Sequence, residues 1–142
     1  MSTPSRVLWS GGEGKILLVR PAPAVMLFVY EGVIGAEAVA SIANAVDREI
    51  ALTGGRRPDQ FLDLEAMTSY ASDFRVQLAQ WGGVNKHRLG QLHVLFNPSS
   101  RLVAMAVSVV NLALGGAFNF ASSRRAFEEA LARAKLASPA TT

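Results

Sequence analysis

Short apolar runs alternate with segments of helical periodicity along most of this chain, and this alternation is the strongest constraint on its fold. Residues 24–31 are apolar on both faces, which is typical of a strand covered on two sides. Residues 36–52 carry an apolar stripe at helical spacing, formed by Val39, Ile42, Val46 and Ile50. Strands that alternate with helices need crossover connections, which favour an at least partly parallel sheet. The sequence therefore predicts an α/β domain.

The other expected elements continue this order along the chain. Two short strands come first and flank the turn signal Gly11-Gly12. The expected strands are residues 6–9, 14–20, 24–31, 61–65, 89–96 and 117–121, and the expected helices are 36–52, 72–81, 101–114 and 124–136. Glycine pairs starting at 54, 82 and 115 are expected to end helices, and Ser99 or Ser100 and Ser122 or Ser123 are expected to cap the last two helices at their N-termini. We predict a mixed, mostly parallel sheet of four to six strands with about four helices, in one domain over residues 1–142 with frayed ends at 1–5 and 137–142.

The composition allows a substantial core and excludes several kinds of chemistry. Half of the 142 residues are apolar and only 18% are charged, unlike a disordered chain. The absence of cysteine excludes disulfides, thiol catalysis and thiolate metal sites. The net charge of +3 is scattered over basic pairs rather than gathered into a stripe with aromatic platforms, so we expect no nucleic-acid binding.

One segment is long and apolar enough to be tested as a membrane span. Residues 102–123 contain no charged residue, which meets the length criterion. The pair Gly115-Gly116 splits this segment, and a helix followed by a buried strand explains the pattern equally well. Residues 1–6 are polar and lack the pattern of a secretory signal. We expect no membrane span and a cytoplasmic location.

Several local patterns, taken with the order of elements, resemble the sulfate-transporter and anti-sigma-factor-antagonist (STAS) family. Residues 28–34, Phe-Val-Tyr-Glu-Gly-Val-Ile, are similar to its second strand, and residues 61–64, Phe-Leu-Asp-Leu, to its central strand. Residues 118–123 and the helix after them are similar to its closing strand and helix. The resemblance covers about residues 14–136 and is strongest to the stand-alone bacterial STAS-like or Sec14-like branch. It implies a STAS-like domain that regulates by binding another protein, without catalysis.

The resemblance also implies a regulatory surface in the polar segment 68–73. In anti-sigma antagonists of this family, a partner kinase phosphorylates the serine of an Asp-Ser pair at the start of the next helix. That pair falls on Ala71-Ser72, so the serine is retained and the aspartate is absent. We assign Ser69, Ser72 and Asp73 as candidate interaction residues. From the residues alone we predict that Ser72 is the N-cap of the helix that starts there, and Asp73 would repel a phosphate placed beside it; a regulated serine stays open as the alternative.

The expected helix at residues 101–114 is apolar around most of its circumference. A helix that only covers a sheet has one polar face that is exposed to solvent. This helix lacks such a face, so we expect a second packing partner to cover it. A partner protein, a second copy of the chain, a lipid chain and the chain's own N-terminal segment are the alternatives. We expect association, including a homodimer, through Val103, Val107, Val110 and Leu114. The alternative function is binding of a small lipid or other apolar ligand, which would need a pocket of several hundred cubic ångströms beside residues 101–120.

The remaining polar residues do not assemble into a catalytic or metal-binding set. His87 and His93 are the only histidines, and no carboxylate stands at a spacing that suggests shared metal coordination. Asp63 and Glu65 lie near a strand end and are expected to accept hydrogen bonds from nearby backbone N–H groups. No glycine pair is followed by the lysine and serine or threonine of a phosphate loop. We therefore expect a domain that is not an enzyme, has no cofactor and has an unknown protein partner.

Overall fold

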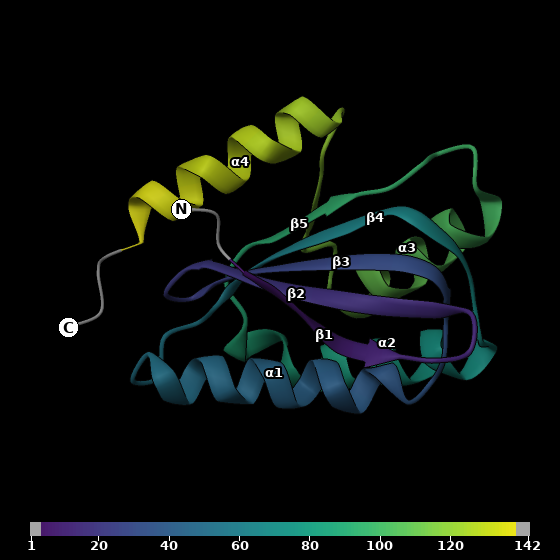
Figure 1. Cartoon of the computed structure of the whole chain (residues 1–142), viewed down its shortest axis with the longest axis horizontal. Coiled ribbons are helices and arrows are strands. Elements are labelled where there is room, and N and C mark those ends of the chain that lie inside the picture. Colours follow the sequence, from purple (N-terminus) through teal and green to yellow (C-terminus); the bar gives the residue numbers. More distant parts are fainter. Residues whose placement is uncertain (1–3, 139–142) are drawn as a thin grey trace.

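Six strands form one sheet in which the spatial order equals the order along the chain, β1 to β6 (Figure 1). The computed structural model describes residues 4–138. Its strands are β1 Ser5–Ser10, β2 Gly14–Ala22, β3 Val25–Ile34, β4 Asp59–Tyr70, β5 Leu92–Leu95 and β6 Phe118–Phe120. Its main helices are α1 Ala38–Leu52, α2 Ser72–Asn85, α3 Arg101–Ala113 and α4 Arg124–Ala137.

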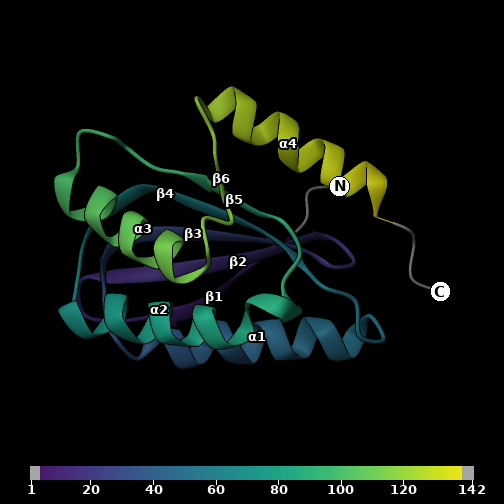
Figure 2. The same cartoon turned by 180° about the vertical axis from the view of Figure 1, so that it is seen from behind.

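The sheet is mixed, as predicted. Strands β1, β2 and β3 pair antiparallel, and β3, β4, β5 and β6 pair parallel. Helices α1, α2 and α3 connect the parallel strands and pack on one face of the sheet. Each connection is a right-handed crossover to the next strand in the same direction along the sheet, so all three helices lie on the same side. Helix α4 packs on the other face, as Figure 2 also shows from behind. The α/β prediction is confirmed.

Two apolar layers follow from the alternation of side chains along the strands. The larger lies between the sheet and α1, α2 and α3, and includes the fully buried Phe28 and Val94. The smaller lies under α4, where the rings of Phe61 and Phe127 meet edge to face with centroids 5.7 Å apart. Phe61 and Leu62 are consecutive in β4 and point to opposite layers, as the period of two requires. Strand β4 is therefore the central strand of the domain.

Strand β4 is longer than predicted. It runs to Tyr70 and includes residues that we expected in a polar elbow. The reason is its partner: β3 continues to Ile34, so that Val33 and Ile34 pair with Ser69 and Tyr70. Residues at this end of β4 are half-buried or exposed, so polar side chains are compatible with the ladder.

Helix α2 also continues beyond its predicted end. It passes through Gly82-Gly83 and ends at Asn85. A methyl group on Gly82 would lie 3.1 Å from Cδ2 of Leu114, at the end of α3. Gly82 therefore allows two helices to approach closely and does not stop the first one.

Helix ends confirm some of the predicted caps. Gly54 and Gly55 have positive φ, and Gly55 N–H donates to the carbonyl of Ile50 at 2.8 Å, which closes α1. The hydroxyl of Ser123 accepts from the N–H of Ala126 at 3.1 Å and caps α4. Ser100 stands at the N-cap position of α3 without a side-chain hydrogen bond.

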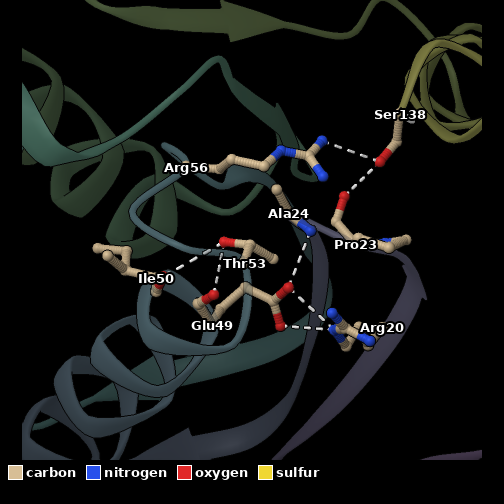
Figure 3. A network of polar contacts seen from close by, with 8 residues as sticks. All are labelled: Arg20, Pro23, Ala24, Glu49, Ile50, Thr53, Arg56 and Ser138. Carbon is tan, nitrogen blue, oxygen red and sulfur yellow. Dashed lines mark hydrogen bonds and ion pairs between the residues drawn. The ribbon is translucent and has the colours of Figure 1, made fainter. Parts of the chain in front are cut away.

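A buried carboxylate fastens the β2–β3 turn to α1 (Figure 3). Glu49 is only 3% exposed and accepts from Arg20 Nε at 2.7 Å and from the N–H of Ala24 at 2.8 Å. The end of α4 reaches the same turn, since the hydroxyl of Ser138 donates to the carbonyl of Pro23. Three parts of the chain that are distant in sequence meet at this turn.

The described ends are more ordered than we expected. Ser5 pairs with Val19 in the sheet, Ala137 closes α4, and Ser138 is hydrogen-bonded. The rest of the predicted frayed ends, 1–3 and 139–142, lies outside the described residues. Within residues 4–138 no helix is both long and apolar enough to cross a membrane. The apolar segment 102–123 forms α3 and β6, so the alternative interpretation as a helix and a strand is confirmed, but β6 is a half-buried to exposed edge strand and not the buried strand that we expected.

Candidate functional site

The β4–α2 junction, residues 69–73, begins the candidate site. Its backbone is fixed by two hydrogen bonds: Ala71 N–H donates to Ile34 at 2.9 Å, and Phe74 N–H donates to the Ala71 carbonyl at 2.9 Å. Ala71 has the extended conformation of an N-cap, with φ −71° and ψ 140°. Alanine has no side-chain oxygen or nitrogen, so the first turn of α2 has no side-chain cap at this position. Ser72 is the first helical residue. The prediction that Ser72 caps α2 was wrong by one position.

The structure places the three predicted interaction residues at this junction. Ser72 and Asp73 are exposed in the first turn of α2, and Ser69 is half-buried in β4, three residues before the first residue of α2. The free N–H groups of the first turn favour negative charge there. Asp73 is already in that turn, so the junction carries an accessible hydroxyl beside an accessible carboxylate.

Helix α3 adjoins the junction. The hydroxyl of Tyr70, at the end of β4, donates to the carbonyl of Leu102 in the first turn of α3 at 2.8 Å. The four residues predicted as an association surface lie on the inner face of α3 and are between 1% and 6% exposed: Val103, Val107, Val110 and Leu114. They recur every three or four residues and pack against the sheet and α2. The predicted association surface was wrong in these four residues.

The outer face of α3 is apolar as well. Leu102, Met105, Val109 and Leu112, here called the α3 stripe, are 49%, 46%, 38% and 81% exposed. Their spacings of three, four and three residues place them on one line of the helix. Strand β1 lies at the edge of the sheet opposite β6, so the described N-terminal segment does not cover them. The sequence indicated that α3 needs a second packing partner, but it did not show which face of the helix remains uncovered.

The interior beneath α2 and α3 has little free space. Two cavities of about 40 Å³ each lie there, both bordered by Tyr30, Leu62 and Phe118. Burial raises the pKa of the Tyr30 hydroxyl, and the amide nitrogen of Gln60 is buried without a partner among the described residues. A water molecule needs about 10–15 Å³ of such space, whereas a small-molecule site has several hundred. These cavities fit water and not a lipid chain.

An ionic cluster joins β4 to α4. Arg124 Nη2 lies 2.8 Å from Asp63 Oδ2 and 2.6 Å from Glu65 Oε1. These hydrogen bonds, first that to Asp63, raise the pKa of Arg124. Asp63 also accepts from the N–H of Glu65 at 3.2 Å, as predicted for this carboxylate. The sequence did not indicate Arg124, which lies 61 residues from Asp63 along the chain. The cluster fastens α4 to the sheet.

The two histidines lie apart. His93 stacks on Phe61 with ring centroids 4.5 Å apart, and burial is the main reason that its pKa is lowered. His87 is in the short 3₁₀ turn Lys86–Arg88 after α2. Among residues 4–138 no three His, Asp or Glu side chains are grouped so that they could hold a metal ion.

Comparison with known proteins identifies the fold. No protein-family model matches the chain, and no curated protein matches it in sequence. Among solved structures it is similar to an uncharacterised protein of the DUF3478 family from Shewanella loihica PV-4, which has a SpoIIAA-like fold. The TM-score is 0.57 over 92% of this chain and 98% of that one, at 13% identity.

The chain has a SpoIIAA-like fold. This confirms the STAS-like fold predicted from the order of elements. At 13% identity the likeness shows the fold alone. A function for this SpoIIAA-like domain has to be argued from its own surface.

Proposed function

We propose that this SpoIIAA-like domain is a non-enzymatic regulatory domain that binds another protein through the α3 stripe and the adjoining β4–α2 junction. The observation that carries the proposal is the α3 stripe, four aligned apolar side chains of which Leu112 is 81% exposed. Contiguous exposed apolar surface rimmed by polar residues is typical of protein contact sites. Arg101 and Ser108 provide polar, exposed neighbours on the same helix.

The spacing of the stripe indicates how a partner would contact it. Apolar residues that recur every three and four positions form a seam that packs against another helix or into an apolar groove. Met105 lies within the stripe, and its flexible thioether adapts to varied partner surfaces. The opposite face of α3 is packed in the core, so the helix presents a fixed surface and loses little freedom on binding.

The junction supplies a place where charge can alter binding. Tyr70 holds the end of β4 against the first turn of α3, so the exposed Ser72 and Asp73 lie on an element fastened to the stripe-bearing helix. A phosphate on Ser72 would add about −1.5 to −2 charge. Such a charge would repel an acidic partner and attract a basic one, with the helix N-terminus moderating its effect on stability.

The test compares two variants as baits in an extract of the native host. Leu112→Asp, made together with Met105→Asp, places charge in the stripe without touching the core. Leu136→Asp is the matched control, because Leu136 is 87% exposed on α4, on the other side of the sheet. We expect the double variant to lose a partner that wild type and the control both retain.

Light scattering on the purified proteins decides whether the partner is a second copy. A wild-type dimer that the double variant converts to monomer, with the control still dimeric, would make the partner another copy of this chain. A monomeric wild type whose recovered proteins are the same as those of the double variant would refute the proposal.

A further inference from the structure

A groove rich in arginine is lined by residues of β1 and α1, at the edge of the sheet opposite β6. These two elements lie side by side in Figure 1. It consists of two adjoining cavities of about 350 and 290 Å³ that share Arg6, Ala45 and Arg48. The first is also lined by Ser41 and Asn44. The second is also lined by Arg20 and Glu49 and by the apolar side chains of Leu18, Met26 and Leu52. We call these two cavities the arginine groove.

The local structure explains why these residues meet. Arg6 pairs with Leu18, which is buried on the helix-covered face of the sheet, so Arg6 projects from the same face at the sheet's outer edge. On α1, Ser41, Asn44 and Arg48 recur at intervals of three and four residues beside the buried stripe of that helix. The edge strand and the helix therefore place polar side chains on the two sides of one groove.

The groove has more positive than negative charge. Arg6 and Arg48 make no ion pair with any residue between 4 and 138. Arg20 is paired with Glu49, which is the one acidic residue lining either cavity among the described residues (Figure 3). Three guanidinium groups and one carboxylate leave an excess of two positive charges. Like charges that share a partly enclosed space raise the local potential and favour an anion.

We propose that the arginine groove binds a phosphate monoester with a small apolar body. A phosphate monoester carries about −1.5 to −2 charge at neutral pH, which matches the excess of two, whereas a carboxylate neutralises one. Guanidinium groups present forked N–H donors that suit phosphate oxygens. Ser41 and Asn44 add neutral donors in the larger cavity.

The second cavity provides for the rest of the ligand. Leu18, Met26 and Leu52 give this cavity an apolar part of its lining, and the cavity volumes of about 350 and 290 Å³ are at the lower end of the range for small-molecule sites. The site shares no residue with the α3 stripe or the β4–α2 junction. The inference is therefore independent of the proposed protein binding.

The test titrates phenyl phosphate into the full chain labelled with ¹⁵N and follows the backbone amides. Inorganic phosphate tests the charged head alone, and phenol tests the apolar body alone. We expect saturable shifts at residues 41–48, with tighter binding of phenyl phosphate than of either fragment. Arg6→Gln and Arg48→Gln should each weaken binding by about tenfold or more, the loss expected for one charge-assisted hydrogen bond. Arg125→Gln is the matched control, since the Arg125 side chain is 90% exposed on α4 and should leave binding unchanged.

We expect both variants to fold, because Arg6 and Arg48 are exposed and make no ion pair with an acidic residue between residues 4 and 138. Melting temperatures within a few degrees of wild type would verify this. Amide shifts that are absent from residues 41–48, or binding that both arginine variants leave unchanged, would overturn the site. Phenyl phosphate that binds no more tightly than inorganic phosphate would overturn the assignment of an apolar body.

Discussion

Replacing Glu49 by alanine should destabilise the domain more than any other single polar change at the β2–β3 turn. The Glu49 carboxylate accepts from Arg20 Nε at 2.7 and 2.9 Å and from the N–H of Ala24 at 2.8 Å. The two donors, Arg20 and Ala24, are affected differently when the Glu49 carboxylate is removed. Ala24 is 5% exposed, so its N–H would be left without a partner, whereas the Arg20 side chain is 41% exposed and can be rehydrated.

These contacts determine how much the free energy of unfolding should fall in Glu49→Ala. An unpaired buried N–H costs about 1–3 kcal/mol, and a hydrogen bond to a charged group contributes about 1.5–3 kcal/mol. Exposure of Arg20 reduces the second figure to about 1 kcal/mol, because water screens the pair and replaces part of it. The expected loss for Glu49→Ala is therefore about 3 kcal/mol. Glu49→Gln keeps an acceptor for the Ala24 N–H and should cost about 1 kcal/mol.

Urea unfolding followed by circular dichroism measures both variants. The midpoint should fall in the order wild type, Glu49→Gln, Glu49→Ala, with an unchanged slope if only stability has changed. In a domain of 142 residues, 3 kcal/mol corresponds to about 10 °C in melting temperature. Equal losses for the two variants would show that the Ala24 hydrogen bond does not dominate, and the reasoning would be refuted.

Three further predictions follow from local geometry. Ala71→Asp should raise the free energy of unfolding by about 1 kcal/mol, because it adds the missing side-chain cap of α2. Ser72→Ala should change the free energy of unfolding by less than about 0.5 kcal/mol, and a loss of about 1 kcal/mol would contradict this placement of the cap. Ala24→Gly should raise stability by about 0.5 kcal/mol in the same urea assay, because Ala24 has a φ of 60° that glycine adopts without strain, and a lower midpoint would contradict this. Burial lowers the pKa of His93 below its ordinary 6.5, so below pH 6.5 the folded state binds fewer protons than the unfolded state. Stability with respect to this group is therefore highest above pH 6.5 and is lost as the pH falls from 6.5 through the lower pKa of the folded state. His93→Phe should therefore reduce the decrease of the urea midpoint between pH 7 and 5. An unchanged decrease would show that other titratable groups cause it.

The sequence by itself determined the order and type of the elements. Period-two and helical patterns are local, so they predicted the α/β class and the mixed sheet without any knowledge of contacts, and the STAS-like fold was implied by the resemblance of local residues and element order to that family. Local chemistry also predicted the glycine end of α1 and a cap of α4 by Ser122 or Ser123, because both depend on residues a few positions apart; the structure selects Ser123. The same reasoning placed Ser72 and Asp73 at the start of α2, one position from the true cap.

Features that depend on a distant partner were decided by the tertiary structure. The length of β4 depends on β3, and the role of Gly82 depends on Leu114 of another helix. Helix α3 is apolar on nearly every side, so its periodicity does not distinguish the inner face from the exposed stripe; packing against the sheet and α2 buried one face and left the other. The arginine groove joins Arg6 to Arg48 only because β1 became the edge strand beside α1. A one-dimensional pattern shows which side chains a segment presents, but which of them meet depends on the order of strands in the sheet and on the side that each helix covers.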